Sequence, residues 1–195
     1  MKFIVSLFVV LFGMSVVNAA DTSWQKFEHN VKLKHGDWGL EVRTYTNDDY
    51  DHYEITNSSI INNVELGLRV AEDADTTEYR AKATHKLFDA GALSLNHRME
   101  YRYFEGNTTD DYWRYRLIAK AKMGDAWLKF QPRWKFGGDN KNDSKIDDVK
   151  YTLGYNLALS DNVVLTPFAE YVTAGETGDW KKQELIGGTT LEVKF

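Results

Sequence analysis

The chain has 195 residues, carries a formal net charge of −5 and contains no cysteine. This length suits one domain or one small barrel. Without cysteine there is no disulfide framework, so burial and backbone pairing must hold the fold. The chain's acidic segments also argue against nucleic acid as a partner.

The first residues predict a secretory signal peptide. Lys2 precedes an apolar run, Phe3–Val17, and small residues stand at positions −3 and −1 before a cleavage site after Ala19. The run is too short to be retained as a spanning helix, and no later apolar run approaches the roughly 18 residues that such a helix needs. We therefore expect residues 1–19 to be removed and residues 20–195 to form one domain, which enters a membrane only as strands.

Ten segments of the remaining chain alternate apolar and polar residues with a period of two, which predicts β-strands. In chain order they are 27–34, 38–43, 64–70, 79–87, 93–103, 113–122, 128–136, 149–157, 163–172 and 185–195. The alternation is clearest where Trp113 and Tyr115 interleave with Arg114 and Arg116.

The region 47–62 leaves room for one more, weaker strand around Tyr50–Thr56. If three strands lie between the tight turns His35–Asp37 and Asp89–Gly91, these turns fall at opposite ends of the strands. The positions of the turns therefore do not decide the number of strands.

Connections of two lengths join these segments. Asp89–Gly91, Met123–Asp125 and Ser160–Asn162 are short, whereas 105–111, 137–147 and 173–179 are longer and polar. Short turns at one end and long loops at the other are typical of outer-membrane barrels. Aromatic residues near strand ends fit the girdles of such barrels; they are Trp38, Tyr101, Tyr103, Trp113, Tyr115, Trp127, Trp134, Tyr171 and Trp180. The pattern predicts an all-β fold, an antiparallel transmembrane β-barrel of 10–12 strands.

A soluble β-sandwich or lipocalin-like barrel would also alternate, with its apolar face inward. Two features argue against it. The polar face of adjacent strands is repeatedly Arg and Lys. On a convex surface exposed to solvent these residues would simply be solvated, and nothing would exclude acidic residues from the same face. The segment Leu191–Phe195 is an alternating strand with a terminal aromatic residue, which resembles the assembly signal of bacterial outer-membrane proteins. We therefore expect a bacterial outer-membrane location, with the lipid bilayer and lipopolysaccharide around the barrel.

The basic face must point into the barrel, because an Arg or Lys facing lipid at the midplane costs roughly 2–4 kcal/mol. The candidate pore-lining residues are Arg80, Lys82, Arg98, Arg102, Arg114, Arg116, Lys120, Lys129, Arg133 and Lys135. The acids concentrate in segments that we expect to be loops, 47–54, 71–78, 105–111 and 139–148. A net positive lumen predicts an anion pathway. The alternative is an interior ion-pair network inside a closed barrel.

The basic alternation of residues 98–106 and 112–136, and the last two strands, resemble the oligogalacturonate-specific (KdgM-like) porins over roughly residues 60–195. This resemblance implies a monomeric channel of twelve strands for acidic oligosaccharides, with two facing basic tracks. The matching positions are Arg98, Arg102, Arg114, Arg116, Lys129, Arg133 and Lys135.

Other chemistry has little support in the sequence. His85 and His97 fall on the apolar face, and no signature of a hydrolase is present. Residues 139–148 share only composition with a calcium loop. We expect no enzyme, catalytic residue, metal or cofactor. The expected function is passive diffusion of small anionic oligosaccharides; the alternative is a closed structural or adhesive barrel without a transport role.

Overall fold

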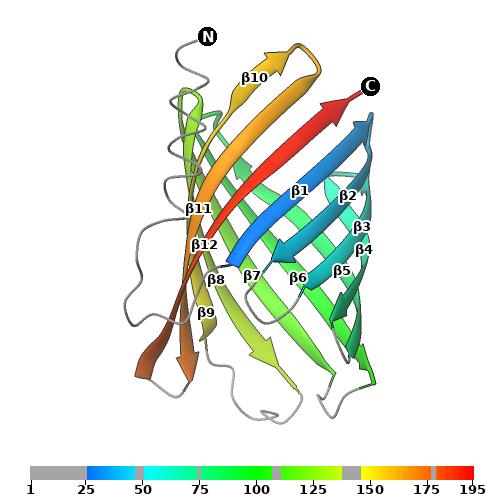
Figure 1. Ribbon diagram of the computed structural model, residues 1–195, viewed down its shortest axis with the longest axis vertical. Coiled ribbons are helices and arrows are strands. Elements are labelled where there is room, and N and C mark those ends of the chain that lie inside the picture. The colour runs from blue at the N-terminus through cyan, green and yellow to red at the C-terminus, as the bar shows by residue number, and fades with distance from the viewer. Residues whose placement is uncertain (1–25, 47–50, 74–75, 107–110, 138–145, 177–178) are drawn as a thin grey trace.

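The computed structural model describes residues 26–46, 51–73, 76–106, 111–137, 146–176 and 179–195 (Figure 1). The signal peptide expected at residues 1–19 lies outside these ranges. Within them, no helix is long and apolar enough to cross a bilayer.

The described residues form strands that close into a barrel (Figure 1). The strands are β1 (Lys26–His35), β2 (Trp38–Thr46), β3 (Asp51–Ile61), β4 (Val64–Asp73), β5 (Thr76–Asp89), β6 (Leu93–Glu105), β7 (Tyr112–Met123), β8 (Ala126–Phe136), β9 (Ile146–Tyr155), β10 (Leu157–Ser160), β11 (Val163–Glu176) and β12 (Asp179–Lys194). Both β9 and β10 pair with β11, and only Asn156 separates them. They act as one strand, so the described part of the chain forms a closed barrel of eleven strands. The expected fold class is confirmed.

The barrel closes through a parallel pair, β1 with β12, while its other strand pairs are antiparallel. An odd number of strands that alternate in direction brings the first and the last to the seam in the same direction. The register runs from Lys26 opposite Ile186 to Lys34 opposite Lys194. This seam differs from the wholly antiparallel closure expected from the sequence and from the even strand numbers usual in bacterial barrels.

Tight turns gather at one end of the barrel, which we call the turn end; the opposite end is the loop end (Figure 1). The turn between β3 and β4 consists of Asn62 and Asn63, both with positive φ (49° and 64°). Two such residues match a type I′ hairpin turn, for which Asn is well suited. The weak strand expected around residues 50–56 is therefore present as β3. It puts four strands between the first turn and the β5–β6 turn, and both turns lie at the same end.

The buried side chains identify the polar face as the inner one. Among the described residues, thirteen buried side chains are polar or charged and five are hydrophobic. A soluble sandwich would show the reverse. The outer face carries exposed apolar residues and aromatic pairs, with ring centroids 5.0 Å apart for Tyr101 and Trp113 and 5.6 Å apart for Tyr115 and Trp134. This face is the apolar, aromatic surface expected of a transmembrane barrel.

Candidate functional site

The strand register brings the ten predicted pore-lining residues to the inner face of β5–β8. Directly opposed residues in antiparallel strands share a face. Arg80 is opposite Arg102, Arg114 is opposite Lys135, and Lys120 is opposite Lys129. Burial agrees, because Arg80 is 6% exposed and Arg114 is 8% exposed.

Five of the ten line a cavity of about 870 Å³ in the lumen, which reaches the turn end. We call this cavity the vestibule. Its wall includes Lys82, Arg98, Arg116, Lys120 and Lys129, together with inner residues of the other strands.

The vestibule carries an excess of positive charge. Four arginines line it, with eight lysines, which are Lys32, Lys34, Lys82, Lys120, Lys122, Lys129, Lys150 and Lys194. Seven acidic side chains are also present, so the twelve basic side chains leave a formal excess of five. The whole chain has a charge of −5. The positive charge is thus concentrated in the vestibule, while the rest of the protein is acidic.

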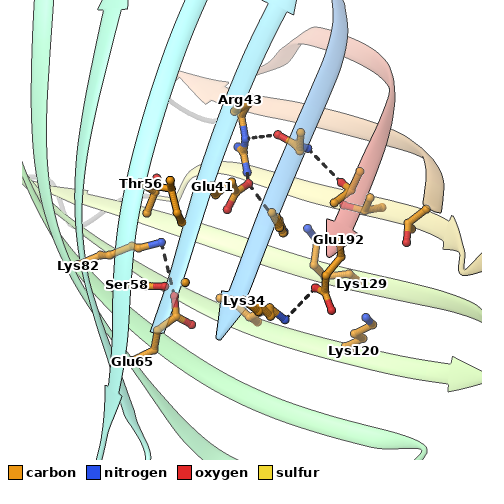
Figure 2. A pocket seen from close by; sticks show the side chains of 18 of the residues that line it. Lys34, Glu41, Arg43, Thr56, Ser58, Glu65, Lys82, Lys120, Lys129 and Glu192 are labelled. Atoms are coloured by element: carbon orange, nitrogen blue, oxygen red, sulfur yellow. Dashed lines mark hydrogen bonds and ion pairs between the residues drawn. The ribbon is translucent and has the colours of Figure 1, made fainter. Parts of the chain in front are cut away.

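Most vestibule cations form ion pairs with carboxylates, whereas Lys120 and Lys122 form none with the described residues. Figure 2 shows Lys34 paired with Glu192 at 2.8 Å and Lys82 with Glu65 at 3.6 Å. No ion pair joins Lys120 to any residue in the described ranges. Its Nζ instead lies 4.2 Å from the ring centroid of Trp127, a cation–π contact.

The other five predicted residues lie nearer the loop end; we call Arg80, Arg102, Arg114, Arg133 and Lys135 the loop-end cluster. Here the carboxylates are closely matched to the arginines.

Glu78 accepts hydrogen bonds from Arg80 and Arg102. Arg114 Nη2 lies 3.0 Å from Asp147 Oδ2, and Arg133 forms two hydrogen bonds with Asp148. Such two-point contacts are the strong form of arginine–carboxylate pairing.

Tyr112 joins the members of this cluster. Its hydroxyl accepts hydrogen bonds from Arg102 and from Arg114, the latter at 2.8 Å. The Nζ of Lys135 lies 4.3 Å from the Tyr112 ring centroid. Among the described residues Lys135 has no carboxylate in ion-pair distance, so it resembles Lys120 in its freedom to meet a solute.

Several acidic residues that were expected in loops lie on strands, inside the barrel. Segments 47–54, 71–78 and 139–148 were expected to hold their acids in loops. The structure instead gives Glu54, Glu78, Asp147 and Asp148 places on β3, β5 and β9, where their partners include Arg69, Arg102, Arg114 and Arg133. The strands extend past the point at which apolar alternation ends, because pairing needs only backbone groups. The lumen is consequently less basic toward the loop end than the sequence indicates.

Glu100 connects the two halves of the lumen. It is 1% exposed, and its carboxylate lies 2.7 Å from Arg116, 3.7 Å from Arg98 and 4.0 Å from Arg80. One buried acid thus compensates three arginines. Some donors remain: Nε of Arg114 and Nε of Arg116 have no hydrogen-bond partner among the described residues.

A row of large and small residues crosses the vestibule wall on β8, β9, β11 and β12. Trp127 is opposite Gly154, which is opposite Phe168, which is opposite Gly188. A Cβ added at Gly154 would lie under 3.0 Å from three atoms of the Trp127 indole, and one at Gly188 would come as close to the Phe168 ring. Each aromatic ring therefore leans over the glycine beside it.

Trp127 was expected in the outer aromatic girdle and lies inside instead. Its place in the alternation is the reason, since Trp127 has the same parity as the inward Lys129, whereas Leu128 faces outward. Tyr112, whose parity matches that of Arg114, is a second inner aromatic that the sequence analysis did not select. Counting parity through each turn would have found both.

Within the described ranges, no group of three or more His, Cys, Asp or Glu side chains could hold a metal ion. His85 and His97 lie on β5 and β6, with their ring nitrogens 3.2 Å apart.

Comparisons with known proteins find a shared fold. No family model matches the sequence, and no curated protein matches it. Among solved structures, the chain is similar to the KdgM porin in complex with disordered oligogalacturonate, with a TM-score of 0.55 and 12% sequence identity. The match covers 77% of this chain and 82% of that chain. At this identity the likeness concerns the barrel fold.

Proposed function

We propose that this chain is an outer-membrane porin through which small anionic oligosaccharides, such as oligogalacturonates, diffuse passively. The observation that carries the proposal is the formal excess of five positive charges on the vestibule wall, in a chain that is acidic as a whole. A cavity lined by one sign of charge concentrates ions of the other sign. The similarity to a porin solved with oligogalacturonate agrees with it.

In this proposal the barrel lies in a bacterial outer membrane as a monomer, with bilayer lipid and lipopolysaccharide around it. Short turns of such barrels face the periplasm, so the vestibule opens there. The solute's carboxylates pass along the lysine ammonium groups that line the vestibule wall. Weak contacts at several sites let a solute enter and also leave. Diffusion needs no covalent step, so we propose no enzymatic activity, metal or cofactor.

One observation favours a second candidate, a closed structural or adhesive barrel. In the loop-end cluster, Arg102, Arg114 and Arg133 each pair with a carboxylate, and Tyr112 joins two of these arginines. Arginines paired in this way fill space and offer a passing anion little charge. The two candidates therefore differ in whether the loop-end cluster lets ions through.

The test is single-channel recording of the refolded mature chain in planar bilayers, with reversal potentials measured in a salt gradient. We expect anion-selective steps that oligogalacturonate blocks. Lys120→Glu and Lys135→Glu should each lower anion selectivity, because neither lysine has a carboxylate partner among the described residues and neither change breaks an ion pair. These variants are cleaner than Arg114→Glu or Arg133→Glu, which would disrupt Asp147 or Asp148 as well.

The control for a charge change outside the vestibule is Lys86→Glu, which also removes an exposed ion pair between Lys86 and Asp89. Lys86 lies on β5 close to the turn end, its side chain is 56% exposed, and it is not among the residues that line the vestibule. Selectivity should stay at the wild-type value in this variant. Well-folded protein that gives no current steps would reject the porin and favour the closed barrel.

A further inference from the structure

We propose that the indole face of Trp127 is a stacking site for the sugar ring of an anionic pyranose, with Lys120 as the partner of the ring's carboxylate. The inference rests on the proposed function and deepens it, because it separates acidic sugars from other anions of equal charge. Three observations around Trp127 carry it.

The indole is held in place at its edge. Its Nε1 donates a hydrogen bond to Asn156 Oδ1 at 3.1 Å, and the Thr166 hydroxyl donates to the same oxygen at 3.0 Å. Asn156 is the residue that interrupts β9 and β10, and its backbone N–H donates to the Asp125 carbonyl oxygen. The ring is thus fixed before any ligand arrives, which lowers the entropic cost of stacking on it.

One face of the ring lies against Gly154 of the neighbouring strand. The space that a Cβ would take there is occupied by indole atoms. This packing keeps the tryptophan flat against the barrel wall and turns its other face toward the vestibule, which Trp127 lines. Phe168 packs over Gly188 in the same way, so two aromatic rings lie on the vestibule wall.

The face toward the vestibule carries Lys120. Its Nζ lies 4.2 Å from the ring centroid, and Lys129 Nζ lies 5.9 Å away. A lysine ammonium held only by a π face is held weakly, by roughly 0.5–1 kcal/mol at exposed sites. A carboxylate is a better partner for it. When one arrives, Lys120 moves onto the carboxylate and leaves the indole face free.

A pyranose ring suits the freed face. Its axial C–H bonds form an apolar patch with slight positive character, and an aromatic ring presents negative charge on its face. An acidic sugar therefore makes two contacts at once, its ring on Trp127 and its carboxylate with Lys120. An acyclic anion makes only the second contact. The site consequently selects for ring-bearing anions.

The experiment compares trigalacturonate with acetylated, amidated triglutamate, which carries the same carboxylates without rings. Refolded wild-type chain in detergent micelles is titrated while its tryptophan fluorescence is recorded, and block of channel current is measured in planar bilayers. For Trp127→Leu we expect loss of the saturable fluorescence change and a half-blocking concentration of trigalacturonate about tenfold higher. Block by triglutamate should stay unchanged.

Two further variants keep the result interpretable. Gly154→Ala retains Trp127 but displaces its ring. This variant should also raise the half-blocking concentration of trigalacturonate. Trp134→Leu removes an outward tryptophan from the same strand and should leave both titration and block at wild-type values.

The outcomes separate the site from the proposed function. Current that acidic oligomers block equally in wild-type and Trp127→Leu would keep the porin and overturn the site. If Trp127→Leu weakened block by trigalacturonate and by triglutamate equally, the site would also be overturned, because Trp127 would then only shape the vestibule. A Trp127-dependent fluorescence change in a protein without current would support the site and reject transport. A wild-type chain whose fluorescence does not respond to trigalacturonate would overturn the site.

Discussion

The ring of His35 stacks on the ring of Phe195 with 5.7 Å between the centroids, and His35 Nδ1 lies 2.7 Å from the Phe195 carbonyl oxygen. The Phe195 N–H in turn donates to the Lys34 carbonyl oxygen. The last residue of the described chain is thereby attached to the end of β1, at the turn end of the parallel seam.

This attachment should stabilise the closed barrel. In His35→Ala the stacking and the hydrogen bond are both lost, so we expect the barrel to unfold a few degrees lower. The measurement is the temperature at which the refolded protein loses its compact migration on gels. His85→Ala, an outward histidine of β5 away from the seam, is the control. An unfolding temperature that drops equally in both variants would contradict a special role for the seam.

Neighbouring glycines of β12 should differ in their tolerance of alanine. At Gly188, which faces inward, an added Cβ would lie under 3.0 Å from the Glu28 carbonyl oxygen and the Phe168 ring. At Gly187, which faces outward, the nearest atom is a Phe27 ring carbon at 3.4 Å. Gly188→Ala should destabilise the barrel by about 1–3 kcal/mol, and Gly187→Ala should have little effect. Urea unfolding in lipid vesicles measures both; equal stabilities would be inconsistent with the close approach of β1 and β12.

Removal of the Glu100 charge should affect stability and selectivity in opposite directions. Glu100→Gln leaves Arg80, Arg98 and Arg116 without their shared counter-charge, so we expect a loss of about 3 kcal/mol in unfolding free energy. The lumen becomes more positive, so anion selectivity should rise. Glu192→Gln, which removes an acid near the more exposed Lys34 and Lys194, is the control and should cost less stability. A Glu100→Gln barrel as stable as wild type would argue against this buried ion-pair network.

Anion selectivity should depend on salt concentration. Electrostatic screening acts over about 10 Å at 0.1 M salt and about 3 Å at 1 M. Lysines of the vestibule that lack ion pairs, such as Lys120, act on a passing ion across open solvent, so the permeability ratio of anion to cation should fall as salt rises. Reversal potentials at several mean concentrations and a constant gradient ratio measure it. A ratio independent of salt would mean that selectivity arises in the tightly paired loop-end cluster instead.

Strand β3 was hard to predict because its alternation of apolar and polar residues is weak. Its outward positions include Asn57 and Ser59, opposite Leu40 and Trp38, and its inward positions include Ile60. Polar residues outside and an apolar residue inside blur the period of two. Its turn, Asn62–Asn63, also lacks the glycine that marks the neighbouring turns. The sequence therefore locates this strand only approximately and leaves the strand number open between ten and twelve.

The amino-acid sequence by itself determined which face of each clear strand points inward, because side chains alternate strictly along a strand and a charge cannot face lipid. The inward Arg and Lys residues of β5–β8 follow from this rule. Tertiary structure alone decided the odd strand number with its parallel seam, and which carboxylates neutralise which arginines. Closure and pairing depend on residues far apart in the chain, such as His35 with Phe195 or Glu78 with Arg102. No local pattern records the distance between such residues; the register of the closed barrel sets it.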